Sequence, residues 1–162
     1  MSRILAIDPG CAESAWVELA AGYPQRHIKE SNGELLTRVR TSNMWTPNVE
    51  LLAIEMIASY GMAVGREVFE TCVWIGKFAE AWESRGGRVM LVYRRDVKLY
   101  HCESVKANDS NIRAALLDRY GPGREKAVGI KSAPGPLYGI KADEWAALAV
   151  ALTAEDVLRR AA

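Results

Sequence analysis

Apolar residues along the chain form short unbroken runs that alternate with longer segments of helical periodicity. Three of these runs have the length and composition of strands covered on both faces of a sheet: residues 4–7, residues 51–58, which include one carboxylate, and residues 88–93. Residues 14–20 follow the first run after a short link, which predicts a hairpin, and residues 23–29 are expected to add a third strand.

Four segments carry apolar residues at intervals of three or four, which is typical of amphipathic helices: 32–40, a stretch within 61–87, 109–120, and 141 to the C-terminus. Asn32 and either Asn108 or Asp109 are expected to cap two of them. Residues 94–100 are predicted to form a basic turn of helix. The glycine- and proline-rich stretch 121–137 is predicted to be a mobile surface loop.

The alternation of strands and helices predicts one α/β domain spanning residues 1–162, with a sheet flanked by helices. No run approaches the length of a membrane span, so no membrane partner is expected, and the N-terminus lacks the pattern of a signal peptide. The three cysteines, Cys11, Cys72 and Cys102, fit neither a disulfide framework nor a zinc site. A reducing cytoplasm is therefore the expected location.

Charge is uneven along the chain although the formal net charge is only +1. Residues 94–141 contain ten basic and five acidic side chains, which leaves about +5 there and −4 elsewhere. Such polarity favours contact of that region with phosphate. The alternative is a set of solvated helix faces with basic loops.

Asp8 follows the first buried run and precedes Pro9 and Gly10, which end regular pairing and allow a sharp turn. Its carboxylate is thus expected at the end of a central strand, where open sheets present their ligands. The alternative is an ordinary turn after a core strand.

Glu55 lies inside the second buried run, and Asp143 lies in the first turn predicted for the last helix. A buried carboxylate requires a partner, which for Glu55 is either a metal ion or an arginine at the sheet end. Asp143 alone is explained by the helix dipole. Taken together, three acids at one edge of a sheet favour a hard divalent cation such as magnesium, which assists phosphodiester cleavage. His27 and His101 lack ligand spacing and are expected at the surface.

These motifs resemble those of the RuvC-type Holliday-junction resolvases, in particular compact phage-like members of the ribonuclease H-like superfamily. The matching parts are residues 4–10, 52–55 and the last helix from Asp143, with a basic region at 93–112. The resemblance implies a mixed five-stranded sheet flanked by helices and a homodimer. It also implies a metal-dependent endodeoxyribonuclease that resolves four-way DNA junctions by paired symmetric nicks.

The resemblance further implies roles for individual residues. Asp8, Glu55 and Asp143 would be catalytic and would hold Mg²⁺ or Mn²⁺. Contacts to branched DNA would come from the following residues: Tyr60, Arg94, Lys98, Lys106 and Arg113.

Two positions depart from the family pattern. The family usually has a second acid three residues after the helix aspartate, where this chain has Ala146; the adjacent Glu144 or the more distant Asp109 would have to replace it. Three residues after the strand glutamate, Ala58 stands where relatives often have an aromatic residue, and Tyr60 is a candidate for that role; the alternative is a tyrosine at the dimer surface. Two alternative functions therefore stay open: a branched-DNA-binding module with weak or lost cleavage, and a nuclease acting on another substrate such as an RNA–DNA hybrid.

Overall fold

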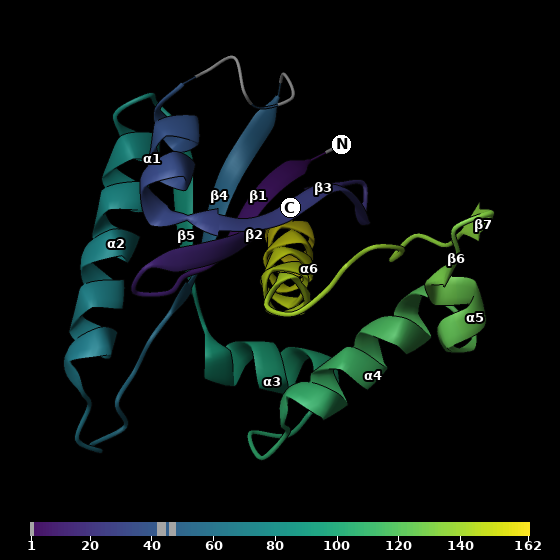
Figure 1. Ribbon diagram of the computed structural model, residues 1–162. Helices are drawn as coiled ribbons and strands as arrows, with labels where there is room; N and C mark the ends of the chain where they lie inside the picture. The colour runs from purple at the N-terminus through teal and green to yellow at the C-terminus, as the bar shows by residue number, and fades with distance from the viewer. Residues whose placement is uncertain (1, 42–44, 46–47) are drawn as a thin grey trace.

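The computed structural model describes residues 2–41, 45 and 48–162, and its centre is a five-stranded mixed sheet (Figure 1). The strand order is β3-β2-β1-β4-β5. Strands β1, β2 and β3 pair antiparallel, whereas β4 runs parallel to both β1 and β5. The strands are β1 (Arg3–Asp8), β2 (Glu13–Ala20), β3 (Tyr23–Ser31), β4 (Val49–Met56) and β5 (Arg88–Tyr93).

Helices cover both faces of this sheet. Helices α1 (Asn32–Arg40) and α2 (Arg66–Glu83) lie together on one side, and α6 (Glu144–Ala161) lies on the other (Figure 1). Helix α3 (Arg94–Cys102) follows β5 directly and packs with α4 (Asp109–Tyr120) beside α6. The mixed sheet flanked by helices confirms the predicted α/β fold, and the strands and helices lie within a few residues of the predicted ranges.

Alternation of side chains along β1 divides the buried residues into two cores. Ile4 and Ala6 face α6, while Leu5 and Ile7 face α1 and α2. Because both faces are covered, the whole run is apolar rather than alternating, which is why the sequence signal was strong.

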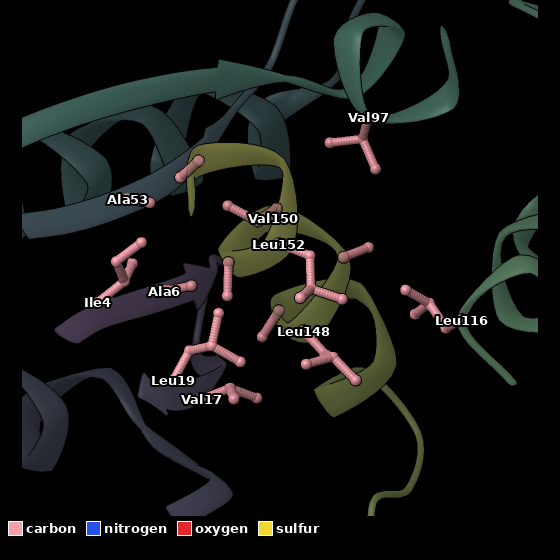
Figure 2. Packing of buried hydrophobic residues seen from close by; sticks show 14 of the residues in the cluster. Ile4, Ala6, Val17, Leu19, Ala53, Val97, Leu116, Leu148, Val150 and Leu152 are labelled. Atoms are coloured by element: carbon pink, nitrogen blue, oxygen red, sulfur yellow. The ribbon is translucent and has the colours of Figure 1, made fainter. Parts of the chain in front are cut away.

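Helix α6 supplies most of the core on its own side of the sheet. Its residues 147–152 are all buried, and Leu148 and Leu152 are fully buried between the sheet and the neighbouring helices (Figure 2). Small side chains such as Ala6 and Ala53 on the strands allow α6 to approach the sheet closely (Figure 2). The N-terminal end of α6 is thereby fixed relative to the ends of β1 and β4.

Two local predictions were wrong. Residues 121–137 are not a simple loop, because α5 (Gly123–Ala127), β6 (Gly129–Ile130) and β7 (Ala133–Pro134) form there. Ala127 and Leu137 are fully buried, and their burial anchors this segment to the α6-side core.

The cap of α1 also differs from the prediction. Ser31, not Asn32, caps the helix by accepting a hydrogen bond from the Glu34 backbone. Asn32 is buried, and its amide donates to the Gly10 carbonyl while its oxygen accepts from the Ser14 hydroxyl. Asn32 therefore holds the turn that follows Asp8. Among the described residues, no helix is both long and apolar enough to cross a membrane.

Candidate active site

Strand alternation places two carboxylates on the face of the sheet that α6 covers. Asp8 follows Ala6 by two positions in β1, and Glu55 follows Ala53 by two positions in β4, so each carboxylate shares the face of its alanine. Ala6 and Ala53 are partners in the parallel ladder. Asp8 and Glu55 therefore lie side by side at the carboxyl ends of two central strands, the edge at which α/β sheets present their sites.

Asp143 brings a third carboxylate to the same edge from the start of α6. It was expected in the first turn of this helix but occupies the N-cap position, one residue before α6 begins, and its side chain makes no capping hydrogen bond. Its side chain is 52% exposed. Repulsion by the Asp143 charge is one of the causes that raise the pKa of Asp8. The structure thus places Glu55 and Asp143, the other two acids singled out in the sequence, close enough to Asp8 for their charges to raise its pKa.

Burial and like charge raise the pKa of Asp8 from 3.8 to about 7. Desolvation is the largest cause, followed by repulsion from Glu55 and then from Asp143, and the cations Arg94 and Lys29 oppose the shift. The pKa of the buried Glu55 is also raised, mainly by desolvation, although Arg94 counteracts this. The nearby cations therefore offset only part of the burial and repulsion of these carboxylates.

Lys29 is the cation next to Asp143, and its Nζ lies 2.7 Å from Asp143 Oδ2. The ladder explains its position, because Asp8 is paired with Ala15 on β2 and Ala15 is paired with Lys29 on β3. The hydrogen bond to Asp143 raises the pKa of Lys29. Sequence analysis did not single out Lys29, because a third strand was expected there but its pairing register with β2 was not.

Arg94 is the second cation of the site and opens α3. Its Nη1 lies 3.4 Å from Glu55 Oε1, and its Nη2 forms an ion pair with Asp109 at the start of α4. An arginine partner for Glu55 is therefore present, as one of the two sequence interpretations expected. Asn108 caps α4 through a capping box, which leaves the Asp109 carboxylate exposed and available to Arg94.

Glu144 lies away from this set of acids. Its buried carboxylate is 2.8 Å from Nδ1 of His27 and accepts a hydrogen bond from the Lys141 backbone N–H at 3.0 Å. His27 is thus half-buried against α6. His101 is half-buried too, with its Nε2 3.0 Å from the Ala149 carbonyl oxygen. The expectation that both histidines are surface residues was wrong, because both side chains hold elements against α6.

Two clefts adjoin the acids, and Arg94 lines both. One, of about 420 Å³, lies between α3, α4 and the start of α6 and is bordered by Asp143, Ala146 and Arg113. The Arg113 guanidinium lies 4.9 Å from the centre of the Trp145 ring. The other cleft, of about 540 Å³, adjoins Glu55 and contains Tyr60 and Lys98.

Lys106 lies apart from both clefts. It lines a separate hollow with His101 and Asp118, between the end of α3 and helix α4. Of the five residues that the resemblance implies for DNA contact, four therefore border the two clefts next to the acids, and Lys106 does not.

The carboxylate oxygens at the sheet edge are the kind of ligand that a hard divalent cation prefers, and the repulsion that raises the Asp8 pKa would favour binding of such a cation. The side chains are not gathered around a common point, however. Within residues 2–41, 45 and 48–162, no group of three or more His, Cys, Asp or Glu side chains has an arrangement that could hold a metal ion. Lys29 and Arg94 instead neutralise Asp143 and Glu55.

No model of a known protein family matches the sequence, and no curated protein matches it either. Solved structures do match. RuvC from Thermus thermophilus aligns with a TM-score of 0.72 and 17% identity, over 98% of this chain and 96% of that one. This chain has the RuvC-type fold. The T. thermophilus RuvC in complex with a Holliday junction substrate aligns with a TM-score of 0.67 and 19% identity, over 99% and 96% of the two chains.

Proposed function

We propose that the chain is a metal-dependent, structure-selective endonuclease that resolves four-way DNA junctions. The observation that carries the proposal is the meeting of Asp8, Glu55 and Asp143 at one sheet edge, where burial and mutual repulsion raise the pKa of Asp8 to about 7. The RuvC-type fold supports this substrate, because one similar RuvC structure contains a Holliday junction.

Asp8, Glu55 and Asp143 would hold Mg²⁺ or Mn²⁺, with Glu55 and Asp143 turning away from Arg94 and Lys29 to do so. When bound, the ion supplies Lewis-acid stabilisation of the charge that develops on the scissile phosphate. In the absence of the ion, Lys29 pairs with Asp143 and Arg94 pairs with Glu55, and Arg94 counteracts the desolvation that raises the pKa of Glu55. After exchange, both cations remain at the site and are free to bind phosphate oxygens.

Phosphate contacts along the DNA arms come from the basic side chains that border the two clefts, with Lys98 and Arg113 on opposite sides of Arg94. These contacts position the duplex without reading its sequence. We further propose that two chains act as a homodimer in the cytoplasm of a bacterial or phage-infected cell. A two-fold dimer matches the two symmetric strands of a four-way junction that receive paired nicks.

A second candidate function is binding of branched DNA with weak or lost cleavage. Two observations favour it: Ala146 stands where a further acid is expected, and the described acids are not gathered for a metal ion. In this case the clefts would still bind the junction, and Lys29 and Arg94 would remain paired with their carboxylates.

The test is cleavage of a labelled synthetic four-way junction in the presence of Mg²⁺ or Mn²⁺, with fork, flap, linear duplex and RNA–DNA hybrid as competing substrates. Paired symmetric nicks in the junction support the proposal. Tight binding without nicks supports the binding module, and preferential cutting of the hybrid supports a different nuclease activity.

The variant Asp8→Asn is expected to keep junction binding and to lose cleavage by at least about a hundredfold, because it removes a carboxylate from the metal-binding set. Gel shifts in EDTA and nicking assays in Mg²⁺ measure the two properties separately. Unchanged nicking by Asp8→Asn would remove Asp8 from the site and with it the proposed mechanism.

A further inference from the structure

Residues 121–141 carry a small hairpin at the periphery of the molecule, beyond the end of α4. Helix α5 and strands β6 and β7 lie there, on the side of α4 away from α3 (Figure 1). The two strands pair antiparallel, and Lys131 and Ser132 form the turn between them. All residues from 130 to 134 are exposed, and none of them lines either cleft beside the acids. The hairpin is therefore a surface feature separate from the site described above.

The base of the hairpin is fixed by close backbone packing. The N–H groups of Gly135 and Leu137 donate hydrogen bonds to the carbonyl oxygens of Val128 and Ala127, at 2.9 and 2.8 Å. A Cβ atom at Gly135 would lie 2.5 Å from the carbonyl oxygens of Ala127 and Lys126, so only glycine allows this approach. Ala127 and Leu137 are fully buried in the core that contains α6. The turn of the hairpin therefore has a defined position relative to α4 and α6.

Charge on this segment is strongly one-sided. Residues 121–141 contain one acid, Glu125, and four basic residues, Arg124, Lys126, Lys131 and Lys141. All four basic residues are exposed. In the part of the chain that the structure describes, none of the four forms an ion pair. Unpaired cations on a rigid support suit a polyanion.

The same surface is poorly suited to a protein partner. Its exposed large apolar side chains are Ile130, 64% exposed, and Tyr138, 41% exposed. Stable protein interfaces bury about 800 Å² on each partner and have an apolar centre. Two strands of two residues each offer no such centre. The excess of positive charge therefore favours a nucleic acid.

Helix α4 spans the distance between the acids and the hairpin. Its first residues, including Asp109 and Arg113, border the cleft beside Asp143, and α5 begins three residues after its last residue. Its 12 residues, at about 1.5 Å each, make it about 18 Å long. This length corresponds to roughly five base pairs of duplex, at about 3.4 Å each. A duplex that leaves the acids along α4 would therefore reach the hairpin.

We propose that the hairpin is a second DNA-binding element, which holds one duplex arm of the junction roughly five base pairs from the cut. Lys131 in the turn and Lys126 at the base bind phosphates of that arm. The inference rests on the proposed function, because the arm is placed along α4 by a junction that lies across the acids. Because the base of the hairpin is fixed, this remote contact sets which phosphate of the strand lies at the acids.

The experiment removes single phosphate charges from the DNA and single cations from the protein. A four-way junction carries one uncharged methylphosphonate linkage, moved in steps from the branch point along each arm. The dissociation constant is measured by fluorescence anisotropy in EDTA for the unaltered protein, Lys131→Ala and Lys131→Arg. Arg88→Ala is the matched control, since Arg88 is also exposed but opens β5, at the opposite end of that strand from Arg94.

For the unaltered protein and for Arg88→Ala, we expect two groups of sensitive linkages, one at the branch point and one roughly five base pairs along an arm. Each sensitive linkage is expected to weaken binding about fivefold at low salt, the order of one lost phosphate contact. Lys131→Ala binds the intact junction about fivefold more weakly and loses only the remote sensitivity, because the two losses remove the same contact. Lys131→Arg keeps the affinity and both groups of sensitive linkages.

Two results would overturn the inference even where paired nicking stands. One is the absence of a remote sensitive linkage for the unaltered protein. The other is a remote sensitivity that Lys131→Ala retains in full. If nicking is absent but the remote sensitivity depends on Lys131, the proposed cleavage fails and the hairpin contact remains. Equal melting temperatures of Lys131→Ala and the unaltered protein confirm that the variant is folded, as expected for an exposed residue.

Discussion

At the scale of single residues, Asp8 shows the strongest conflict between burial and charge. Its carboxyl group shares a sheet edge with two other acids, and its pKa of about 7 means that the metal-free protein holds a proton there in mildly acidic solution. An ionised Asp8 therefore costs folding free energy when no cation is bound. This conflict separates the site from ordinary surface ion pairs, in which both groups stay solvated.

The pH dependence of stability follows from this pKa. The unfolded chain ionises Asp8 near pH 3.9, whereas the folded chain does so only near pH 7, so the folded state loses stability relative to the unfolded state as pH rises between these values. Asp8→Asn removes the cost. In EDTA we expect Asp8→Asn to raise the melting temperature, more at pH 8 than at pH 5. The gain in unfolding free energy at pH 8 has an upper limit of about 4 kcal/mol, at about 1.4 kcal/mol per pKa unit.

Thermal unfolding followed by circular dichroism at both pH values measures this effect. Glu125→Gln is a matched control, since Glu125 is an exposed acid on α5, away from the sheet edge. An equal change in melting temperature at pH 5 and pH 8 for Asp8→Asn would contradict the raised pKa.

Ala146 allows a gain-of-function prediction at the same scale. It follows Asp143 by three residues and borders the same cleft, so Ala146→Asp places a carboxylate one helical turn from Asp143 on the same side of α6. We expect Mn²⁺ to bind this variant about tenfold more tightly, as measured by calorimetry on the DNA-free protein. Glu144→Gln tests the neighbouring position and should leave Mn²⁺ affinity unchanged, because Glu144 is already bonded to His27. Equal Mn²⁺ affinities for Ala146→Asp and the unaltered chain would show that the helix face does not reach the ion.

At the scale of elements, helix α6 connects the core to the site. Its buried middle holds the helix on β1 and β2, and its N-cap residue, Asp143, lies close enough to Asp8 to raise the Asp8 pKa. The position of the third acid is thus a consequence of apolar packing several residues further along the helix.

Leu148→Ala tests this dependence. Leu148 is fully buried, and the substitution is expected to cost about 2–5 kcal/mol of unfolding free energy, as buried leucines do when a cavity forms. Urea unfolding measures the loss, and Val157→Ala on the exposed side of the same helix should change the free energy by less than about 0.5 kcal/mol. Similar losses for the two variants would indicate that α6 is not packed as described.

Sequence reasoning predicted the elements well where one physical rule dominates. The run at residues 4–7 and the periodic helices were identified because burial on both faces or on one stripe leaves a strong pattern. It failed at residues 121–137, where Ala127 and Leu137 anchor a segment whose glycines and prolines are typical of loops.

The site was predicted in the same uneven way. Asp8 and Glu55 were found because a charged residue at the end of a buried strand or within it is unusual, and Asp143 was found with them through its order in the chain. Lys29 was missed, because its role depends on the pairing register of β2 and β3, which no local pattern in the sequence fixes. Lys106 was placed with the basic set by its sequence position, but the turn after α3 carries it into a separate hollow.

At the scale of the whole molecule, basic side chains border both clefts that adjoin the acids. Arg94 and Lys98 border the cleft beside Glu55, while Arg94 and Arg113 border the cleft beside Asp143. A bound polyanion would therefore pass over the acidic edge between two basic sides.

The salt dependence of junction binding tests this arrangement. Lys98→Ala is expected to reduce the slope of log K against log salt by about 0.9, which corresponds to one lost phosphate contact. Titrations at several salt concentrations give the slope. Lys106→Ala should have a smaller effect because Lys106 lies in a separate hollow. A larger effect for Lys106 than for Lys98 would mean that DNA approaches the hollow between the end of α3 and α4.

Arg94 has one further consequence. Strand β5 ends at Tyr93 and α3 begins at Arg94, so no loop separates the backbone of Arg94 from the sheet. This single side chain pairs with Glu55 on one side and Asp109 on the other. An anion that binds Arg94 in either cleft therefore competes with both Glu55 and Asp109. Binding in one cleft would change the charge balance in the other, because the two clefts share Arg94 as a counter-ion.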